Sequence, residues 1–175
     1  RRLFLARDRF GIKPLYWAMA NGVFIFASEL KGMLASGLVS RRLNPDAIWH
    51  YLSLGAVSAP RTILADVSAL LPGHYMIVEN GQVVIRQYWD LGRSANGPRQ
   101  PMHPVEAERE LRRLLEESIR LHMIADVPVG AYLSGGLDSS ALVALIRRHS
   151  SAPLKTFSIG FTDTSLDESG HQQTL

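Results

Sequence analysis

The sequence has 175 residues, 46% of them hydrophobic and 20% charged, with a formal net charge of +3, and a chain of this size buries the core of one domain or of two small ones. It contains no cysteine, which excludes disulfides, thiolate metal sites and cysteine nucleophiles among these residues. Its arginines are scattered, which indicates solvated faces and no nucleic-acid partner. No apolar run reaches the ~18 residues of a membrane span and no signal peptide is visible, so we expect a cytoplasmic protein without a membrane partner.

Short apolar runs predict the strands of the first half of the chain. Residues 3–6 predict the first strand. Residues 15–29 and 74–89 each predict a β-hairpin, because an Asn-Gly pair separates two apolar runs in each segment. Antiparallel strands of this kind indicate a mainly antiparallel β structure.

Two short helices are predicted among these strands. Residues 29–37 form an apolar, helix-favouring segment that ends at Gly37. Asn44 is a favourable helix N-cap and Pro45 is tolerated at the first helical position, which together predict a helix over about residues 45–53. Residues 1–90 are therefore expected to form an α+β module.

Residues 91–104 differ in composition from both flanks. They contain two glycines and three prolines with little apolar content, which predicts a linker. After it, the pattern predicts helix, strand, helix and strand over 105–125, 127–133, 137–149 and 154–161. A strand–helix–strand unit of this length requires a parallel sheet. Residues 105–175 are therefore expected to open an α/β domain.

The segment Ser134–Ser140, SGGLDSS, lies where the predicted strand ends and the next helix begins. Free backbone N–H groups and the positive end of the helix dipole make that place an anion site. Gly135 and Gly136 let the backbone approach a ligand closely, and Ser134, Ser139 and Ser140 add hydroxyl donors. The pattern favours phosphate or pyrophosphate.

Asp138 is the unusual member of this segment, because a carboxylate repels a phosphate unless a cation joins the two. Mg²⁺ prefers oxygen ligands and is commonly shared between a carboxylate and nucleotide phosphates, so Asp138 is a candidate metal ligand. Neither G-x-x-x-x-G-K-[ST] nor G-x-G-x-x-G occurs here. A plain strand-to-helix turn, with Asp138 favourable to the helix dipole, is the alternative interpretation.

This segment resembles the PP-loop, SGGxDS, of the ATP pyrophosphatases, which cleave ATP between its α- and β-phosphates. The segments 6–18, 26–34, 71–82, 125–146 and 155–161 resemble, in the same order, successive stretches of glutamine-hydrolysing asparagine synthetases. The chain is thus similar to the end of a glutaminase-type domain over 1–90, a linker over 91–104 and the start of a PP-loop synthetase domain over 105–175.

The resemblance implies a reaction and a set of contacts. In that family glutamine supplies ammonia, Mg-ATP adenylates aspartate, and ammonia displaces AMP to give asparagine. Asp138 matches the magnesium carboxylate. The positions expected to bind ATP are Leu133, Ser134, Gly135, Gly136, Asp138, Ser139, Ser140 and Ile159. A homodimer of the parent protein is left open.

The resemblance also implies what these residues do not contain. The family's glutaminase nucleophile is an N-terminal cysteine, and later synthetase motifs follow the segment seen here, so we expect an internal fragment that is inactive alone. No catalytic residue is assigned. A sibling ligase acting on another carboxylate, such as a β-lactam synthetase, and a non-catalytic nucleotide-binding or scaffolding piece are the open alternatives.

Several other residue types favour structural roles. Asp8 is expected to close a turn or pair with a neighbouring arginine. Asp163, Asp167 and Glu168 follow the last predicted strand, where Ser165 and Glu168 favour a helix cap over a ligand site. The six histidines lack metal-site spacing, and the tryptophans and tyrosines are expected in the core.

Overall fold

A computed structural model of the protein describes residues 1–95, 101–150 and 152–160. It divides into two compact units, Arg1–Arg99 and Gln100–Leu175. Asp163, Asp167 and Glu168, together with the cap expected at Ser165, lie outside the described residues. No helix in the described part of the chain is both long and apolar enough to cross a membrane.

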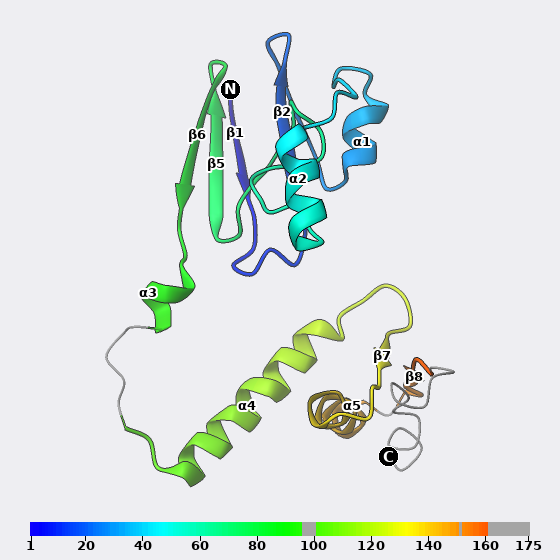
Figure 1. Cartoon of the computed structure of the whole chain (residues 1–175). Helices are drawn as coiled ribbons and strands as arrows, with labels where there is room; N and C mark the ends of the chain where they lie inside the picture. Colours follow the sequence, from blue (N-terminus) through cyan, green and yellow to red (C-terminus); the bar gives the residue numbers. More distant parts are fainter. Residues whose placement is uncertain (96–100, 151, 161–175) are drawn as a thin grey trace. The chain divides into compact units, whose positions relative to one another are not determined.

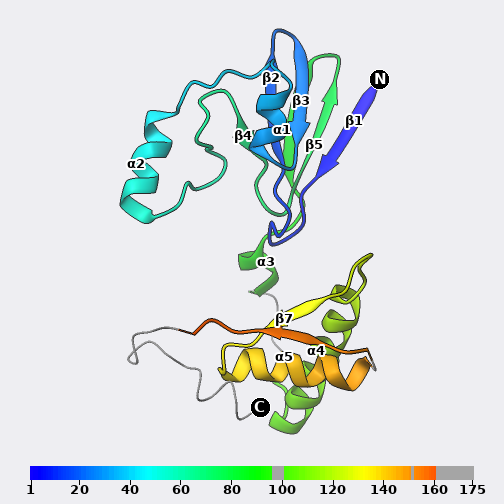
Figure 2. The ribbon, with the colours of Figure 1, turned by 90° about the vertical axis from the view of Figure 1, so that its right-hand side faces the viewer.

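The first unit contains two antiparallel sheets (Figures 1 and 2). One has the order β1-β5-β6, formed by Arg2–Ala6, His74–Glu79 and Gln82–Gln87. The other has the order β3-β2-β4, formed by Val23–Ala27, Tyr16–Ala20 and Ser68–Ala69. Both predicted hairpins are confirmed: β2 pairs with β3 and β5 with β6. Their turns use the Asn-Gly pairs with positive φ at both residues, as the twist of a tight hairpin requires.

Two apolar clusters form the core of this unit. In the first, Leu70, Met76 and Val78 are buried, with apolar side chains of both sheets packed against them. In the second, Met33 of helix α1 (Leu30–Ala35) is buried against Ala18 and Leu64. The sheets therefore enclose one cluster, and α1 covers the other.

Helix α2 (Pro45–Leu54) begins as its sequence predicts. The Asn44 side chain accepts hydrogen bonds from the N–H groups of Asp46 and Ala47, and Gly55 ends the helix in the left-handed region at φ 71°. The expectation that all tryptophans lie in the core is wrong for this helix. Trp49 is 71% exposed, whereas Ala47 on the same helix is fully buried.

The turn after β1 is organised by two adjacent charged residues. The Arg7 guanidinium donates hydrogen bonds to three backbone carbonyls, those of Leu70 at 2.6 Å and of Gly11 and Lys13 at 3.0 Å each. The Asp8 carboxylate accepts from the backbone N–H groups of Ile12 at 2.9 Å and Lys13 at 3.1 Å. Both side chains thus bond to backbone, which supports the structural interpretation of Asp8.

These bonds predict a pH-dependent contribution to stability. The backbone N–H of Ile12, followed by that of Lys13, lowers the pKa of the Asp8 carboxyl. A lowered folded-state pKa gives stability that is present above the unfolded value of about 4 and is lost as the pH falls through the folded value. We expect Asp8→Ala to lower the melting temperature at pH 7, with a deficit that shrinks toward pH 2. A deficit independent of pH, or an Asp8 carboxyl that titrates at its ordinary value by NMR, would contradict this account.

The second unit is built on two helices and a strand pair. Helix α4 spans Pro104–His122 and helix α5 spans Leu137–His149. Strand β7 (Gly130–Tyr132) pairs in parallel with β8 (Lys155–Phe157), as a strand–helix–strand unit requires. In Figure 1 both helices lie to the left of this strand pair. Both strands are shorter than predicted. Tyr132 is 79% exposed, so the expectation that the tyrosines lie in the core is wrong at this residue.

Helical residues occupy both ends of the segment predicted as a linker. Helix α3 (Leu91–Ala95) occupies its first residues, where the Asp90 carboxylate accepts from the N–H of Arg93. Helix α4 already begins at Pro104, because His103 forms a capping box with Glu106. A capping role for a histidine was not predicted. Along α4, Ile119 is buried but Leu111 and Leu114 are about half exposed, so only part of its apolar side packs.

Candidate functional site

The glycine-rich segment connects the parallel strand pair to helix α5. Leu133, which follows β7, is 8% exposed, and its N–H donates to the carbonyl of Phe157 at 2.9 Å. Gly136 is the N-cap of α5, and the helix starts at Leu137. Residues 134–136 therefore form the turn between a parallel strand and a helix N-terminus, the location where anions bind in α/β structures.

The two glycines of this turn have different roles. Gly135 has φ 84°, in the left-handed region that side chains disfavour, so the turn requires glycine there. Gly136 has φ −75°, which any residue adopts. A Cβ added to Gly136 would meet Ser134 Oγ at 3.4 Å, an ordinary contact. Neither the backbone nor the packing of the described residues thus requires glycine at 136, whose missing side chain leaves room for a ligand.

Two of the three serines bond to each other, and the third bonds to the backbone of the turn. Ser139 Oγ lies 3.0 Å from Ser134 Oγ and accepts from the Ser134 N–H at 3.2 Å. Ser140 Oγ donates to the carbonyl of Gly136 at 2.6 Å. The sequence predicts hydroxyls that donate to a phosphate, whereas in this structure all three also stabilise the shape of the turn.

Backbone groups supply further donors. The N–H groups of Leu137, Asp138 and Ser139 belong to the first turn of α5, where no intrahelical acceptor exists. Within the described residues no other acceptor is found for them. Three such groups at the positive end of a helix favour an anion with several oxygens.

Asp138 is exposed and lies in the first turn of α5. No group of three or more metal-binding side chains is found among the described residues, so a metal held by protein ligands alone does not fit here. A single carboxylate does fit Mg²⁺ that is shared with phosphate oxygens, because Mg²⁺ keeps several waters and commonly takes only one or two protein carboxylates.

The two predicted positions that flank this turn are brought near it by strand pairing. Leu133 ends the β7 side, and Ile159, which is 65% exposed, follows β8. The residue before Ile159 was not predicted as part of the site. Ser158 Oγ donates to the carbonyl of Leu133 at 2.6 Å. A polar residue inside the apolar run 157–161 is the sequence signal that could have drawn attention to Ser158.

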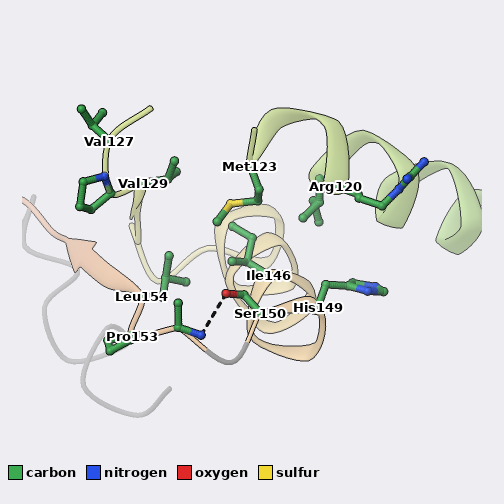
Figure 3. Close-up of a pocket in the computed structure, with 12 residues that line it drawn as sticks. Arg120, Met123, Val127, Val129, Ile146, His149, Ser150, Pro153 and Leu154 are labelled. Atoms are coloured by element: carbon green, nitrogen blue, oxygen red, sulfur yellow. Dashed lines mark hydrogen bonds between the residues drawn. The ribbon is translucent and has the colours of Figure 1, made fainter. Parts of the chain in front are cut away.

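A pocket of about 560 Å³ lies at the opposite end of α5 (Figure 3). The last residues of α4 and α5 line it together with the segments around Val129 and Leu154, and Ser150 Oγ accepts from the N–H of Ala152 at its edge. None of the predicted nucleotide-binding residues lines this pocket. The residues predicted to bind the nucleotide therefore lie away from this pocket, around the exposed turn at the N-terminus of α5.

Two known families match successive parts of the chain, the first unit and then the part that contains the glycine-rich turn. Residues 1–89 match the family model of a glutamine amidotransferase domain, and residues 110–175, which include the turn, match that of asparagine synthase. The chain belongs to the glutamine-hydrolysing asparagine synthetase family. The resemblance identified from the motifs is thereby confirmed.

Curated relatives match most of the chain. The chain is 36% identical to putative glutamine-hydrolysing asparagine synthetase 2 of Methanocaldococcus jannaschii over 91% of its length and 31% of that protein. It is also 36% identical to glutamine-hydrolysing asparagine synthetase 1 of Bacillus subtilis over 95% of its length and 26% of that protein. Amidase chyE of Penicillium rubens is 37% identical over 82% of the chain and 21% of that protein. The chain thus spans less than a third of the length of these relatives.

Proposed function

We propose that the protein containing this chain is a ligase that makes asparagine from aspartate, with glutamine as nitrogen donor and ATP as the source of energy. The observation that carries the proposal is the SGGLDSS turn, placed between a parallel strand and a helix N-terminus within the part that matches asparagine synthase. In the same proposal, residues 1–90 end a glutaminase-type domain, 91–104 contain the linker, and 105–175 open a parallel-sheet PP-loop domain.

The proposed reaction has two steps. A carboxylate oxygen of aspartate attacks the α-phosphorus of ATP, the bond from that phosphorus to the bridging oxygen breaks, and pyrophosphate leaves. Ammonia then attacks the acyl carbon, AMP leaves with the bonding electrons, and a proton passes to solvent. No residue of this chain is assigned to glutamine hydrolysis.

In this proposal the turn holds the pyrophosphate part of ATP. The N–H groups of the first turn of α5 donate to phosphate oxygens, and the bare Gly136 allows their approach. The proposed ATP-binding residues are Leu133, Ser134, Gly135, Gly136, Asp138, Ser139, Ser140 and Ile159. Asp138 would hold Mg²⁺, which neutralises phosphate charge when bound. A homodimer and a cytoplasmic location belong to the same proposal.

A second candidate function is a ligase of the same family, such as an amidotransferase or a β-lactam synthetase, that acts on another carboxylate. The similarity to amidase chyE, which is 37% identical over 82% of the chain and does not carry the name of an asparagine synthetase, favours considering it. The nucleotide chemistry would be the same, and only the acceptor would differ.

The test uses the full-length protein with Mg-ATP, glutamine and either aspartate or another carboxylic acid. We expect AMP, pyrophosphate and asparagine to form in equal amounts, and only when aspartate is present. Release of AMP that depends on a different acid would select the second candidate. Release of ADP and phosphate in place of AMP and pyrophosphate would overturn both candidates.

A further inference from the structure

The contact between Ser158 and Leu133 departs from regular strand pairing. The register pairs Tyr132 with Phe157, so the next step of a parallel ladder pairs Leu133 with Ser158. The first bond of this step is present, since the Leu133 N–H donates to the Phe157 carbonyl. A regular ladder would next give the Leu133 carbonyl the N–H of residue 159. Within the described residues that bond is not found, and the Ser158 hydroxyl donates to this carbonyl at 2.6 Å.

This carbonyl immediately precedes the glycine-rich turn. Ser134 follows it, and its N–H and hydroxyl both contact Ser139 in the first turn of α5. The Leu133–Ser134 peptide bond therefore connects the hydrogen bond from the end of β8 with the two hydrogen-bond contacts to the helix N-terminus. A carbonyl oxygen at the mouth of an anion site also carries partial negative charge, and a hydroxyl that donates to it offsets that charge.

We propose that Ser158 is a positioning residue for the nucleotide. Its hydroxyl fixes the orientation of the Leu133 peptide group, and thereby the position at which the turn meets the phosphates of ATP. This inference rests on the proposed function, because it assumes that the turn binds ATP. Ser158 itself is given no contact with the reacting atoms.

Fold stability and nucleotide positioning are separable here. The pairing of β7 with β8 extends to the bond between Leu133 and Phe157 without the Ser158 hydroxyl. Removing that hydroxyl therefore leaves the backbone pairing of the strands in place and frees the Leu133 carbonyl to rotate toward the anion site. Small displacements of binding groups have large effects on ligand geometry.

The experiment compares three variants of the full-length protein. Ser158→Ala removes the hydroxyl, and Ser158→Thr keeps it. Ser150→Ala is a matched control, because the Ser150 hydroxyl also bonds to a backbone group but lies at the other end of α5, where it accepts from Ala152. The dissociation constant for Mg-ATP is measured by calorimetry, together with the melting temperature and the KM values for ATP and aspartate.

We expect Ser158→Ala to raise the dissociation constant and the KM for ATP about 5-fold, the effect of one neutral hydrogen bond, with the KM for aspartate unchanged. Ser158→Thr should restore most of the affinity, and Ser150→Ala should match the wild type. Wild-type affinity in Ser158→Ala, or an affinity loss that Ser158→Thr does not reverse, overturns the positioning role. A wild-type protein that does not bind Mg-ATP instead overturns the proposed function, and the inference with it.

Discussion

Asp138→Asn in the full-length protein is expected to weaken Mg-ATP binding about 100-fold and to abolish most of the magnesium dependence of binding. The substitution keeps the size of the side chain and removes the charge that attracts the cation. A loss of about 100-fold corresponds to roughly 3 kcal/mol, which is within the several kcal/mol that a metal ion supplies at a phosphate site. Calorimetric titration with ATP, with and without Mg²⁺, measures both effects.

Asp46 provides a matched control for this prediction. Like Asp138, it is an acidic residue in the first turn of a helix, so Asp46→Asn loses the same favourable interaction with the helix dipole. That loss costs about 0.3–1 kcal/mol of stability and should be similar in both variants. Only Asp138→Asn should alter Mg-ATP binding. Equal nucleotide affinities in the two variants would mean that Asp138 serves the helix alone, which is the plain-turn alternative.

Alanine at the two adjacent glycines is expected to have opposite consequences. Gly135→Ala places a side chain at φ 84°, which costs about 1–2 kcal/mol, and should lower the melting temperature. Gly136→Ala adopts its φ of −75° without strain and should lose about 1 kcal/mol or less as a poorer N-cap. Its new Cβ would nevertheless stand where the backbone approaches a phosphate, so we expect at least about 10-fold weaker ATP binding.

The comparison depends on measuring stability and binding in the same samples. Thermal unfolding should rank Gly135→Ala below Gly136→Ala, and calorimetry should show that Gly136→Ala is folded yet binds ATP poorly. If Gly136→Ala binds ATP as tightly as the wild type, the phosphates do not approach this part of the turn. If Gly135→Ala is as stable as the wild type, the left-handed conformation at 135 is not imposed by the fold.

Local sequence signals predicted those parts of the fold that local physics determines. Asn21-Gly22 and Asn80-Gly81 need no distant partner to favour a tight hairpin turn, and both hairpins are present. Asn44 and Pro45 similarly specify the start of α2 by themselves. Glycine, serine and aspartate favour a junction between a strand and a helix, so these residues also predict the turn before α5.

Features that depend on distant residues could not be predicted in this way. The exposure of Trp49 depends on which residues of α2 meet the rest of the unit. An apolar pattern alone does not show which side of the helix is buried. The role of His103 as a cap could not be expected from its residue type, because Ser, Thr, Asp and Asn are the side chains preferred at the N-cap. The Ser158 bond requires the register of β7 against β8, which no short segment specifies.

The orientation of the peptide group that leads into the glycine-rich turn consequently depends on tertiary pairing, whereas the turn itself is held by local bonds. Ser158 and Leu133 are 25 residues apart, so the carbonyl that precedes the turn is fixed only after β8 has docked beside β7. A synthetic peptide covering 127–149 would contain every residue of the motif and still lack the partner that orients its first peptide group. Transplanting the motif into another protein would therefore require both strands in register. During folding, the Leu133 peptide group should become ordered late, after this long-range contact forms.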